Sequence, residues 1–173
     1  MQKSSGIKLY SFTGLFAALI FLVTAYLFHI PTPATGGYIH LGDAFVYLAA
    51  SMLPLPYGVA AAGIGEGLSD LLTGSAMYAV PTLIIKCAMA FCFTSKAKTV
   101  LTGRNMAATI PAGLLCVGGY YLAEVILFHN FTTPLAEIPA NLVQAAASAV
   151  IYLVIGKAFD RLHVKNSLAV LAK

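Results

Sequence analysis

The sequence has very little charge. Only 9% of its 173 residues are Asp, Glu, Lys or Arg, whereas soluble domains carry roughly 25%. Sixteen charged side chains cannot cover the surface of a water-soluble domain of this length, and 60% of the residues are hydrophobic. These figures exclude a soluble globular domain and indicate that the lipid bilayer surrounds most of the chain.

The chain also lacks the motifs of several protein classes. Its three cysteines, Cys87, Cys92 and Cys116, lie in apolar stretches without Cys-x-x-Cys spacing, which is typical of small buried residues and not of disulfides or a metal site. No Walker motif occurs, and the apolar stretches contain no His-Glu-x-x-His, Gly-x-Ser-x-Gly or Cys-His arrangement. We therefore expect neither an enzyme nor a bound cofactor. Without a long basic run, the net charge of +4 gives no indication of nucleic-acid binding.

Long apolar stretches separated by Gly and Pro clusters predict an all-α membrane protein. At roughly 20 residues per spanning helix, the length allows about six spans and leaves no room for a soluble domain. Residues 43–73 could instead form one kinked helix, but it would be roughly 46 Å long, too long for one crossing. We therefore predict that residues 1–173 form a single six-helix transmembrane domain, with spans near 9–29, 43–54, 57–73, 79–95, 107–128 and 136–158.

The positions of the basic residues predict the orientation. In the six-span arrangement nine of the ten lysines and arginines lie on one side, and the opposite loops, 30–42, 74–78 and 129–135, contain none. Because basic loops stay in the cytoplasm, both termini are expected there, in a multi-pass protein of the cell membrane. Lys3 and Lys8 precede the first apolar run, which no signal-type cleavage site follows, so we expect that helix to be retained.

Polar residues in the predicted spans gather near their external ends, whereas the inner halves are nearly pure Ala, Leu, Val, Ile and Phe. Ionisable residues in a span usually face a bundle interior or a cavity, and helical spacing places several of these side chains on common faces. We therefore predict a pocket that opens to the outside and is closed at the bottom, for a small polar molecule. The candidate binding residues are His40, Asp43, Glu66, Asp70, Lys86, Tyr120, Tyr121, Glu124, Asn141 and Gln144.

Some of these residues have plainer interpretations. Lys86 could form a structural ion pair with Glu66, Asp70 or Glu124, and Asp43 could be only the N-cap of its helix. A metal site made by His40, Asp43 and a second histidine, His129, matches no known spacing, so none is expected.

Three tyrosines and one loop also have alternative interpretations. Tyr47, Tyr78 and Tyr152 are more typical of packing or of the membrane interface than of ligand binding. The external loop 30–42 contains two prolines and a Gly pair. It could be a lid over the pocket or a passive connector.

Small residues recur in the first span, where Thr13 and Ala17, and Gly14 and Ala18, form small-xxx-small pairs. Such pairs let helices approach closely in lipid. A partner subunit or packing within the bundle would explain them.

These features together resemble a known family. Six short spans, an external Pro/Gly loop leading into Gly42-Asp43-Ala44, and a Gly/Ala-rich third span with Glu66 and Asp70 resemble the substrate-binding S component of a prokaryotic energy-coupling factor (ECF) vitamin transporter. Residues 31–43, continuing to Lys86, are similar to the riboflavin-type branch, which includes proteins assigned to pyridoxine or hydroxymethylpyrimidine.

The resemblance implies a division of labour. Such a subunit captures a vitamin outside and topples in the membrane on a transmembrane scaffold subunit, driven by two cytoplasmic ATPases that use the ATP. The matching docking positions are Gly14, Ala17 and Ala18, although the pattern here is Gly-xxx-Ala and not Ala-xxx-Ala.

For the ligand we expect pyridoxine or a hydroxymethylpyrimidine, hydrogen-bonded by Lys86 and the acids and stacked on Tyr120 or Tyr121. Riboflavin and a queuosine precursor are alternatives, whereas folate and cobalamin fit one interior cation less well. A channel or an independent secondary transporter would need polar residues through the inner halves or an internal repeat. The sequence shows neither.

Overall fold

The computed structural model describes residues 2–32 and 35–166, with side chains from residue 6 onward. The chain is mostly helical. It contains α1 (Gln2–Tyr26), α2 (Asp43–Met52), α3 (Leu55–Leu72), α4 (Ala79–Phe91), α5 (Gly103–Phe128) and α6 (Ile138–Arg161), with the 3-10 turns η1 (Ala76–Tyr78) and η2 (Thr133–Glu137) and the two short strands β1 (Ile30–Thr32) and β2 (Gly37–Ile39).

Each of the six predicted spans overlaps one of these helices. Three segments are long and apolar enough to cross a membrane, namely Gly6–Tyr26, Gly103–Phe128 and Thr133–Arg161. The segments Asp43–Met52 and Ala76–Phe91 are apolar but shorter. The fold is thus a helical membrane bundle, and the count of six crossings stays a prediction.

Prolines separate the two short helices at the centre of the chain. Leu53 ends α2 in an extended conformation, as expected of a residue before proline, and Pro54 is the N-cap of α3. Pro56 lies in the first turn of α3. Backbone N–H groups there have no partner within the helix, so the missing N–H of proline costs no hydrogen bond. The chain therefore reverses within two residues.

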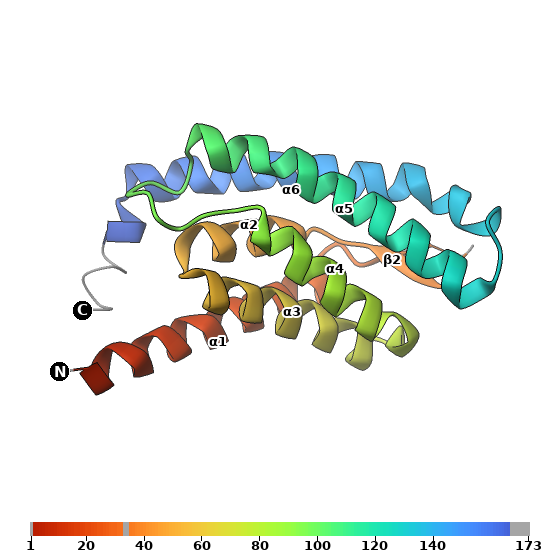
Figure 1. Ribbon diagram of the computed structural model, residues 1–173, viewed down its shortest axis with the longest axis horizontal. Coiled ribbons are helices and arrows are strands. Elements are labelled where there is room, and N and C mark those ends of the chain that lie inside the picture. Colours follow the sequence, from red (N-terminus) through yellow and green to blue (C-terminus); the bar gives the residue numbers. More distant parts are fainter. Residues whose placement is uncertain (1, 33–34, 167–173) are drawn as a thin grey trace.

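The helices form a bundle in which α2 and α4 lie between two pairs (Figure 1). Helices α1 and α3 pack together on one side, and α5 and α6 run side by side on the other. The start of α1, the end of α6 and the segment between α4 and α5 lie at one end, which we call the terminal end. The strands lie toward the opposite end, which we call the hairpin end.

Close contact between α1 and α3 depends on a glycine. A Cβ at Gly65 would lie 2.7 Å from the carbonyl oxygen of Ala17 and 2.8 Å from the side chain of Ile20. No larger residue fits without moving the helices apart, so the small residues of α3 serve packing within the bundle.

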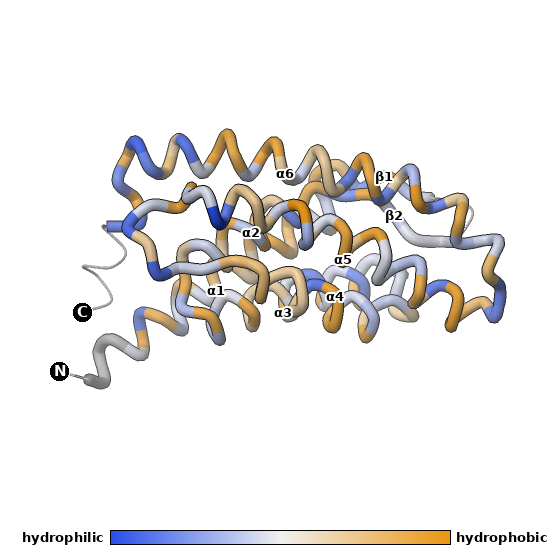
Figure 2. Tube along the Cα trace, turned by 45° about the horizontal axis from the view of Figure 1, so that its top comes forward, coloured by the Kyte–Doolittle hydropathy of each residue, from blue (hydrophilic) through white to orange (hydrophobic). Residues whose placement is uncertain are grey.

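The outer surface of the bundle is apolar along its length. Leu22, Ile110, Leu114, Ile126 and Val154 are all at least half exposed, and apolar residues recur on the outer turns of the helices in Figure 2. In water such a surface would drive aggregation, whereas in a bilayer it faces lipid tails.

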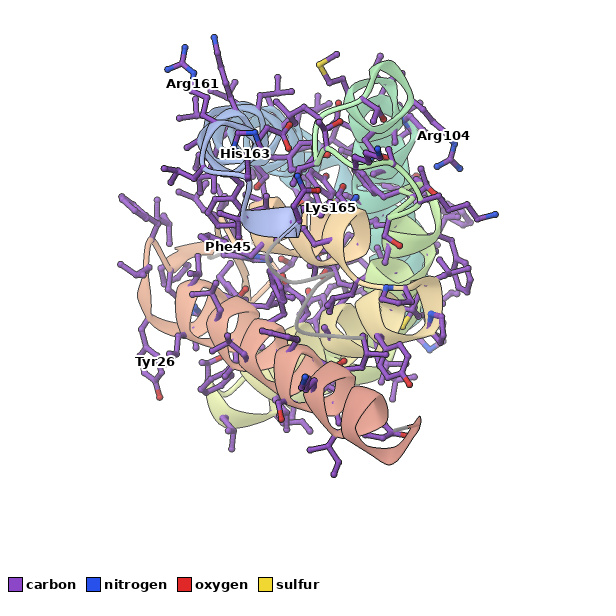
Figure 3. All side chains as sticks on the ribbon, turned by 90° about the vertical axis from the view of Figure 1, so that its left-hand side faces the viewer. Tyr26, Phe45, Arg104, Arg161, His163 and Lys165 are labelled. Carbon is purple, nitrogen blue, oxygen red and sulfur yellow. The ribbon has the colours of Figure 1, made fainter. Side chains whose placement is uncertain are left out.

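The terminal end is polar and held by specific hydrogen bonds. Arg104, Arg161 and Lys165 lie there, as Figure 3 shows when the molecule is viewed from that end. Asp160 accepts hydrogen bonds from the backbone nitrogens of Val100 and Leu101 at 2.6 and 2.9 Å. These contacts tie the segment between α4 and α5 to the end of α6.

Lys165 contributes a second tie at the same end. Its ammonium group donates hydrogen bonds to the carbonyl oxygens of Ser51 at 2.6 Å and Thr99 at 3.2 Å. Partial burial lowers the pKa of Lys165 to about 8. Lys165, four residues beyond the end of α6, thereby binds the end of α2 and the segment between α4 and α5.

Candidate functional site

A pocket of about 390 Å³, including its part open to solvent, lies at the hairpin end. Because this volume includes open solvent, the enclosed space itself is smaller. The hairpin, α3, α4, α5, η2 and α6 all contribute to its walls, which are rich in tyrosines and carboxylates. The lining residues are Thr32, Gly37, Tyr38, His40, Asp70, Tyr78, Thr82, Tyr120, Glu124, Glu137, Asn141 and Gln144.

The hairpin covers one side of the pocket and is attached to α3. Strands β1 and β2 pair antiparallel, with Pro31 opposite Tyr38. The hydroxyl of Tyr38 contacts Asp70 Oδ1 at 2.6 Å and Ser69 Oγ at 3.2 Å, and its ring stacks on His29 with centroids 3.9 Å apart. The two strands therefore cover the pocket with a face that carries a tyrosine.

Two more tyrosines line the opposite walls. Tyr78, which ends η1, donates hydrogen bonds to the Thr35 carbonyl oxygen at 3.1 Å and to Glu124 Oε1 at 3.3 Å. The hydroxyls of Tyr120 and Thr82 lie 3.0 Å apart and join α5 to α4. Aromatic walls with a few fixed polar groups are typical of sites for ring-shaped ligands.

A buried ion pair lies beneath the pocket. Lys86 Nζ of α4 is 2.5 Å from Asp43 Oδ1 of α2, and both residues are fully buried. The second carboxylate oxygen of Asp43 accepts a hydrogen bond from Gln144 Nε2 at 2.9 Å. Because the carboxylate has partners on both oxygens, its burial costs less than that of an isolated charge.

Gln144 connects this ion pair to the hairpin. Its Oε1 accepts from the backbone nitrogen of His40 at 3.0 Å, so both bonds fix the orientation of the amide. His40 Nδ1 accepts from the backbone nitrogen of Gly42 at 3.1 Å. The ring proton therefore belongs on Nε2, which lies 3.6 Å from Glu66 Oε2.

Gly42 is required by close packing around His40. A Cβ there would overlap Thr24 Oγ1 and would lie 2.7 Å from Glu66 Oε1 and 3.1 Å from His40 Nδ1. The backbone before α2 thus passes through a space that only a glycine fits.

An aromatic layer closes the bundle below the polar residues. Tyr47 stacks on Phe93 with ring centroids 4.8 Å apart, and Tyr152 meets both rings edge to face at 5.8 and 5.6 Å. All three side chains are at most 2% exposed. They lie one to two turns from Asp43, Lys86 and Gln144 toward the terminal end, or roughly 6 to 12 Å along the helices. Among the described residues this layer fills the interior of the bundle with buried aromatic rings.

Comparison with known proteins identifies the type of molecule to which this site belongs. The sequence model of the ECF-type riboflavin transporter S component matches residues 4–161. The chain belongs to this family. It is also 32% identical over 130 residues to an uncharacterized protein from Pyrococcus woesei. The aligned residues cover 75% of this chain and 86% of that protein. The family consists of substrate-binding transporter components and not of enzymes.

The structure of this S component brings nine of the ten predicted binding residues to one end. Six of them line the pocket, namely His40, Asp70, Tyr120, Glu124, Asn141 and Gln144. Asp43, Glu66 and Lys86 are buried beside it and are not wall residues. Tyr121 lies outside, and its hydroxyl donates to the carbonyl oxygen of Phe131 at 3.2 Å.

Two expectations about the ion pair need correction. The partner of Lys86 is Asp43, and not one of the three acids expected from the sequence, Glu66, Asp70 or Glu124. Asp43 is not an N-cap either, because Gly42 holds that position and Asp43 is the first residue of α2. The carboxylate faces α4 and α6, where it receives the lysine and the glutamine amide.

Sequence reasoning did not select six of the lining residues, namely Thr32, Gly37, Tyr38, Tyr78, Thr82 and Glu137. Thr32 and Gly37 belong to a hairpin that the Pro/Gly composition did not reveal. Tyr47, Tyr78 and Tyr152 had been expected to pack or to lie at the membrane interface. Tyr47 and Tyr152 do pack in the core, whereas Tyr78 lines the pocket. Glu137 follows a proline-containing loop and is buried.

The residue types that can ligate a metal come together in a different set from the one considered from the sequence. Among the described residues His40, Asp43 and Glu66 offer ligand atoms within 4.8 Å of one another. However, both oxygens of Asp43 are already bonded to Lys86 and Gln144. His129 is an exposed C-cap of α5 with φ 50°, and it does not belong to this group.

The three candidate docking positions on α1 do not face the same way. Gly14 and Ala18 are exposed, and a Cβ at Gly14 would meet no atom within 4 Å. Ala17 is 7% exposed and packs against α3 at Gly65. A partner could therefore reach Gly14 and Ala18 but not Ala17.

Proposed function

We propose that this S component binds a small single-ring vitamin, pyridoxine or a hydroxymethylpyrimidine, in the pocket at the hairpin end. The observation that carries the proposal is the pocket itself, with Tyr38, Tyr78 and Tyr120 in its walls and carboxylates and amides between them. A flat heteroaromatic ring stacks on tyrosines, and its hydroxyl or amino groups meet the polar atoms.

The polar binding roles are divided differently from the sequence prediction. Asp70, Glu124, Asn141 and Gln144 are wall residues that can contact the ligand. Lys86 and Asp43 support the wall from below through Gln144. The ion pair thus acts through the position of the glutamine amide.

The orientation in the membrane is part of the proposal. The terminal end, with Arg104, Arg161 and Lys165, lies in the cytoplasm according to the positive-inside rule. The hairpin end then opens outward, and the chain crosses the membrane six times. The hairpin serves as a cover that admits the vitamin from outside and closes over it.

Transport requires partners that supply ATP hydrolysis. We propose that the exposed small residues Gly14 and Ala18 of α1 dock this subunit on the transmembrane scaffold of an ECF module with two ATPases. Toppling on that scaffold would turn the loaded pocket toward the cytoplasm. A channel is disfavoured, because the buried layer of Tyr47, Phe93 and Tyr152 interrupts the interior.

Riboflavin is the second candidate, because the matching family is described by that vitamin. The two candidates differ in size, and the three fused rings of a flavin with its side chain require more space than a single ring. The free volume of about 390 Å³ favours the smaller ligand.

The test is a thermal-shift panel on the detergent-purified chain with pyridoxine, hydroxymethylpyrimidine, riboflavin and queuine. We expect one of the first two compounds to raise the melting temperature. Tyr120→Leu should abolish the shift, whereas Tyr121→Leu, the neighbouring residue outside the pocket, should retain it. If riboflavin alone stabilises the chain, riboflavin replaces the proposed ligand. If no compound stabilises the chain, vitamin binding is contradicted.

A further inference from the structure

The acidic residues of the chain are concentrated around the pocket. Five of the six, Asp43, Glu66, Asp70, Glu124 and Glu137, are at most 5% exposed and lie at the hairpin end. The sixth, Asp160, lies at the terminal end and binds backbone nitrogens there. The distribution of negative charge is therefore strongly one-sided.

Very little positive charge balances these acids. Lys86 is fully buried close to these acids, and its ammonium group is already bonded to Asp43. Among the described residues no lysine or arginine lines the pocket. Burial of unbalanced carboxylates is costly, so the empty site would gain most from a ligand that brings positive charge.

Asp70 and Glu124 share one geometry. Each is 3% exposed and lines the pocket, and each has one carboxylate oxygen held by a tyrosine hydroxyl, from Tyr38 in one case and Tyr78 in the other. The second oxygens, Asp70 Oδ2 and Glu124 Oε2, have no partner with hydrogen-bond geometry among the described residues, although the hydroxyls of Thr82 and Thr35 lie near the two carboxyl groups. Buried acceptors of this kind are normally satisfied, so a donor is missing at both places.

We propose that the pocket selects a ligand that carries a positive charge and N–H donors, such as an amino-substituted nitrogen heterocycle in its protonated form or a ring bearing an ammonium group. Its donors bind the free oxygens of Asp70 and Glu124, and its charge compensates the two carboxylates. The three wall tyrosines add attraction between cation and ring. This inference rests on the proposed function and names the chemistry of its substrate.

The same geometry excludes other ligand chemistry. Where the carboxyl group is ionised, a carbonyl oxygen or a phosphate placed against its free oxygen would set two acceptors against each other and leave both unsatisfied. The site should therefore distinguish an amino group from an oxo group at one ring position, although the two groups have nearly the same size.

The test uses isothermal titration calorimetry on the detergent-purified full chain with matched pairs of compounds. One pair is 4-amino-5-hydroxymethyl-2-methylpyrimidine and its 4-oxo analogue, and the other is pyridoxamine and pyridoxine. We expect the amino member of at least one pair to bind about tenfold or more tightly than its partner, as loss of a hydrogen bond to a charged group predicts. Asp70→Asn and Glu124→Gln should each lower the affinity for the amino compound by about tenfold or more.

Asp160→Asn is the control, because it also removes one negative charge but lies at the other end. The affinity of the Asp160→Asn variant for the amino compound should equal that of the parent chain. Equal binding of both members of a pair, or unchanged affinity in both pocket variants, would overturn the inference while leaving vitamin binding intact. If none of the four compounds binds, the inference is tested by the net charge of the ligand that copurifies with the chain. A cationic ligand supports the inference, and a neutral or anionic ligand contradicts it. If no ligand copurifies either, the proposed function fails, and this inference fails with it.

Discussion

The carboxylate of Asp43 and the ammonium group of Lys86 form a fully buried ion pair 2.5 Å apart that joins α2 to α4. Gln144 of α6 adds a third helix to the pair through its hydrogen bond to Asp43. Three helices that are far apart in the sequence therefore meet at one charged centre directly beneath the pocket.

Breaking this pair should destabilise the protein strongly. Lys86→Met leaves the Asp43 carboxylate buried and unpaired, for an expected loss of about 3–5 kcal/mol in the free energy of unfolding. Asp43→Asn combined with Lys86→Met removes both charges and should restore at least about half of that loss. Chemical unfolding in detergent measures both effects. A double variant no more stable than Lys86→Met would show that the two charges do not depend on each other.

His40 gives the folded protein a pH dependence. Burial, reinforced by nearby Lys86, lowers the pKa of His40 to about 3, whereas the unfolded chain protonates this residue near pH 6.5. The unfolded state binds a proton that the folded state excludes, so stability is lost as the pH falls below 6.5. At pH 5 the loss from this residue is about 2 kcal/mol.

The measurement compares the parent chain with His40→Gln at pH 7.5 and at pH 5. Glu66, Asp43 and Lys86 surround the ring in both proteins, so their contributions largely cancel. The stability difference between the two should shrink at the lower pH. A parent chain that loses no more stability than His40→Gln would indicate that His40 is protonated in the folded state.

Gly42 and Gly118 form a matched pair of glycine sites. Gly42→Ala places a Cβ against Thr24, Glu66 and His40 and should cost about 1–3 kcal/mol. Gly118→Ala, in α5 with no atom within 4 Å of the new Cβ, should be neutral or slightly stabilising because alanine favours helix. Melting temperatures in detergent test both. Equal effects of the two substitutions would contradict the packing described around His40.

The docking proposal predicts two separate losses on α1. Ala18→Leu enlarges an exposed residue and should prevent copurification with the ECF module without changing affinity for the vitamin. Ala17→Leu pushes α1 away from Gly65 of α3. It should therefore reduce the stability of the isolated chain, an effect that does not depend on docking. Leu15→Ala, also exposed on α1, is the control and should dock normally. Normal docking of Ala18→Leu would place the contact elsewhere.

The orientation can be tested with single cysteines in a background without Cys87, Cys92 and Cys116. Phe131→Cys lies beyond α5 at the hairpin end and Leu162→Cys beyond α6 at the terminal end, and both native side chains are 72% exposed. A membrane-impermeant maleimide added to intact cells should label position 131 and spare position 162 until the cells are permeabilised. The reverse pattern would invert the proposed direction of uptake.

The helices could be predicted from the sequence because local features define them. Apolar runs separated by the double proline at Pro54 and Pro56 give helix bounds within about four residues of those observed, except that α1 begins at Gln2, well before the predicted start of its span at residue 9. The hairpin could not be predicted, because Pro31 and Gly36 resemble an irregular connector. Its pairing depends on contacts such as Tyr38 with Asp70, 32 residues apart.

The site was predicted in composition more than in arrangement. Polar residues are rare enough in this chain that their presence near one end of each span identified most of the pocket region. Four acids lie within reach of Lys86 by depth alone, and only the rotation of α2 relative to α4 decides that Asp43 is its partner. Tyr78 was assigned to packing or to the membrane interface because a single tyrosine near a helix end fits these roles as well as ligand binding.

The most direct test of the account is mass spectrometry of the small molecules released when the detergent-purified protein is denatured, with the Tyr120→Leu variant purified in parallel. The account predicts one nitrogen heterocycle in about equimolar amount from the parent chain and its loss from the variant. Release of no compound, or of equal amounts from both proteins, would contradict the claim that this pocket holds the transported vitamin.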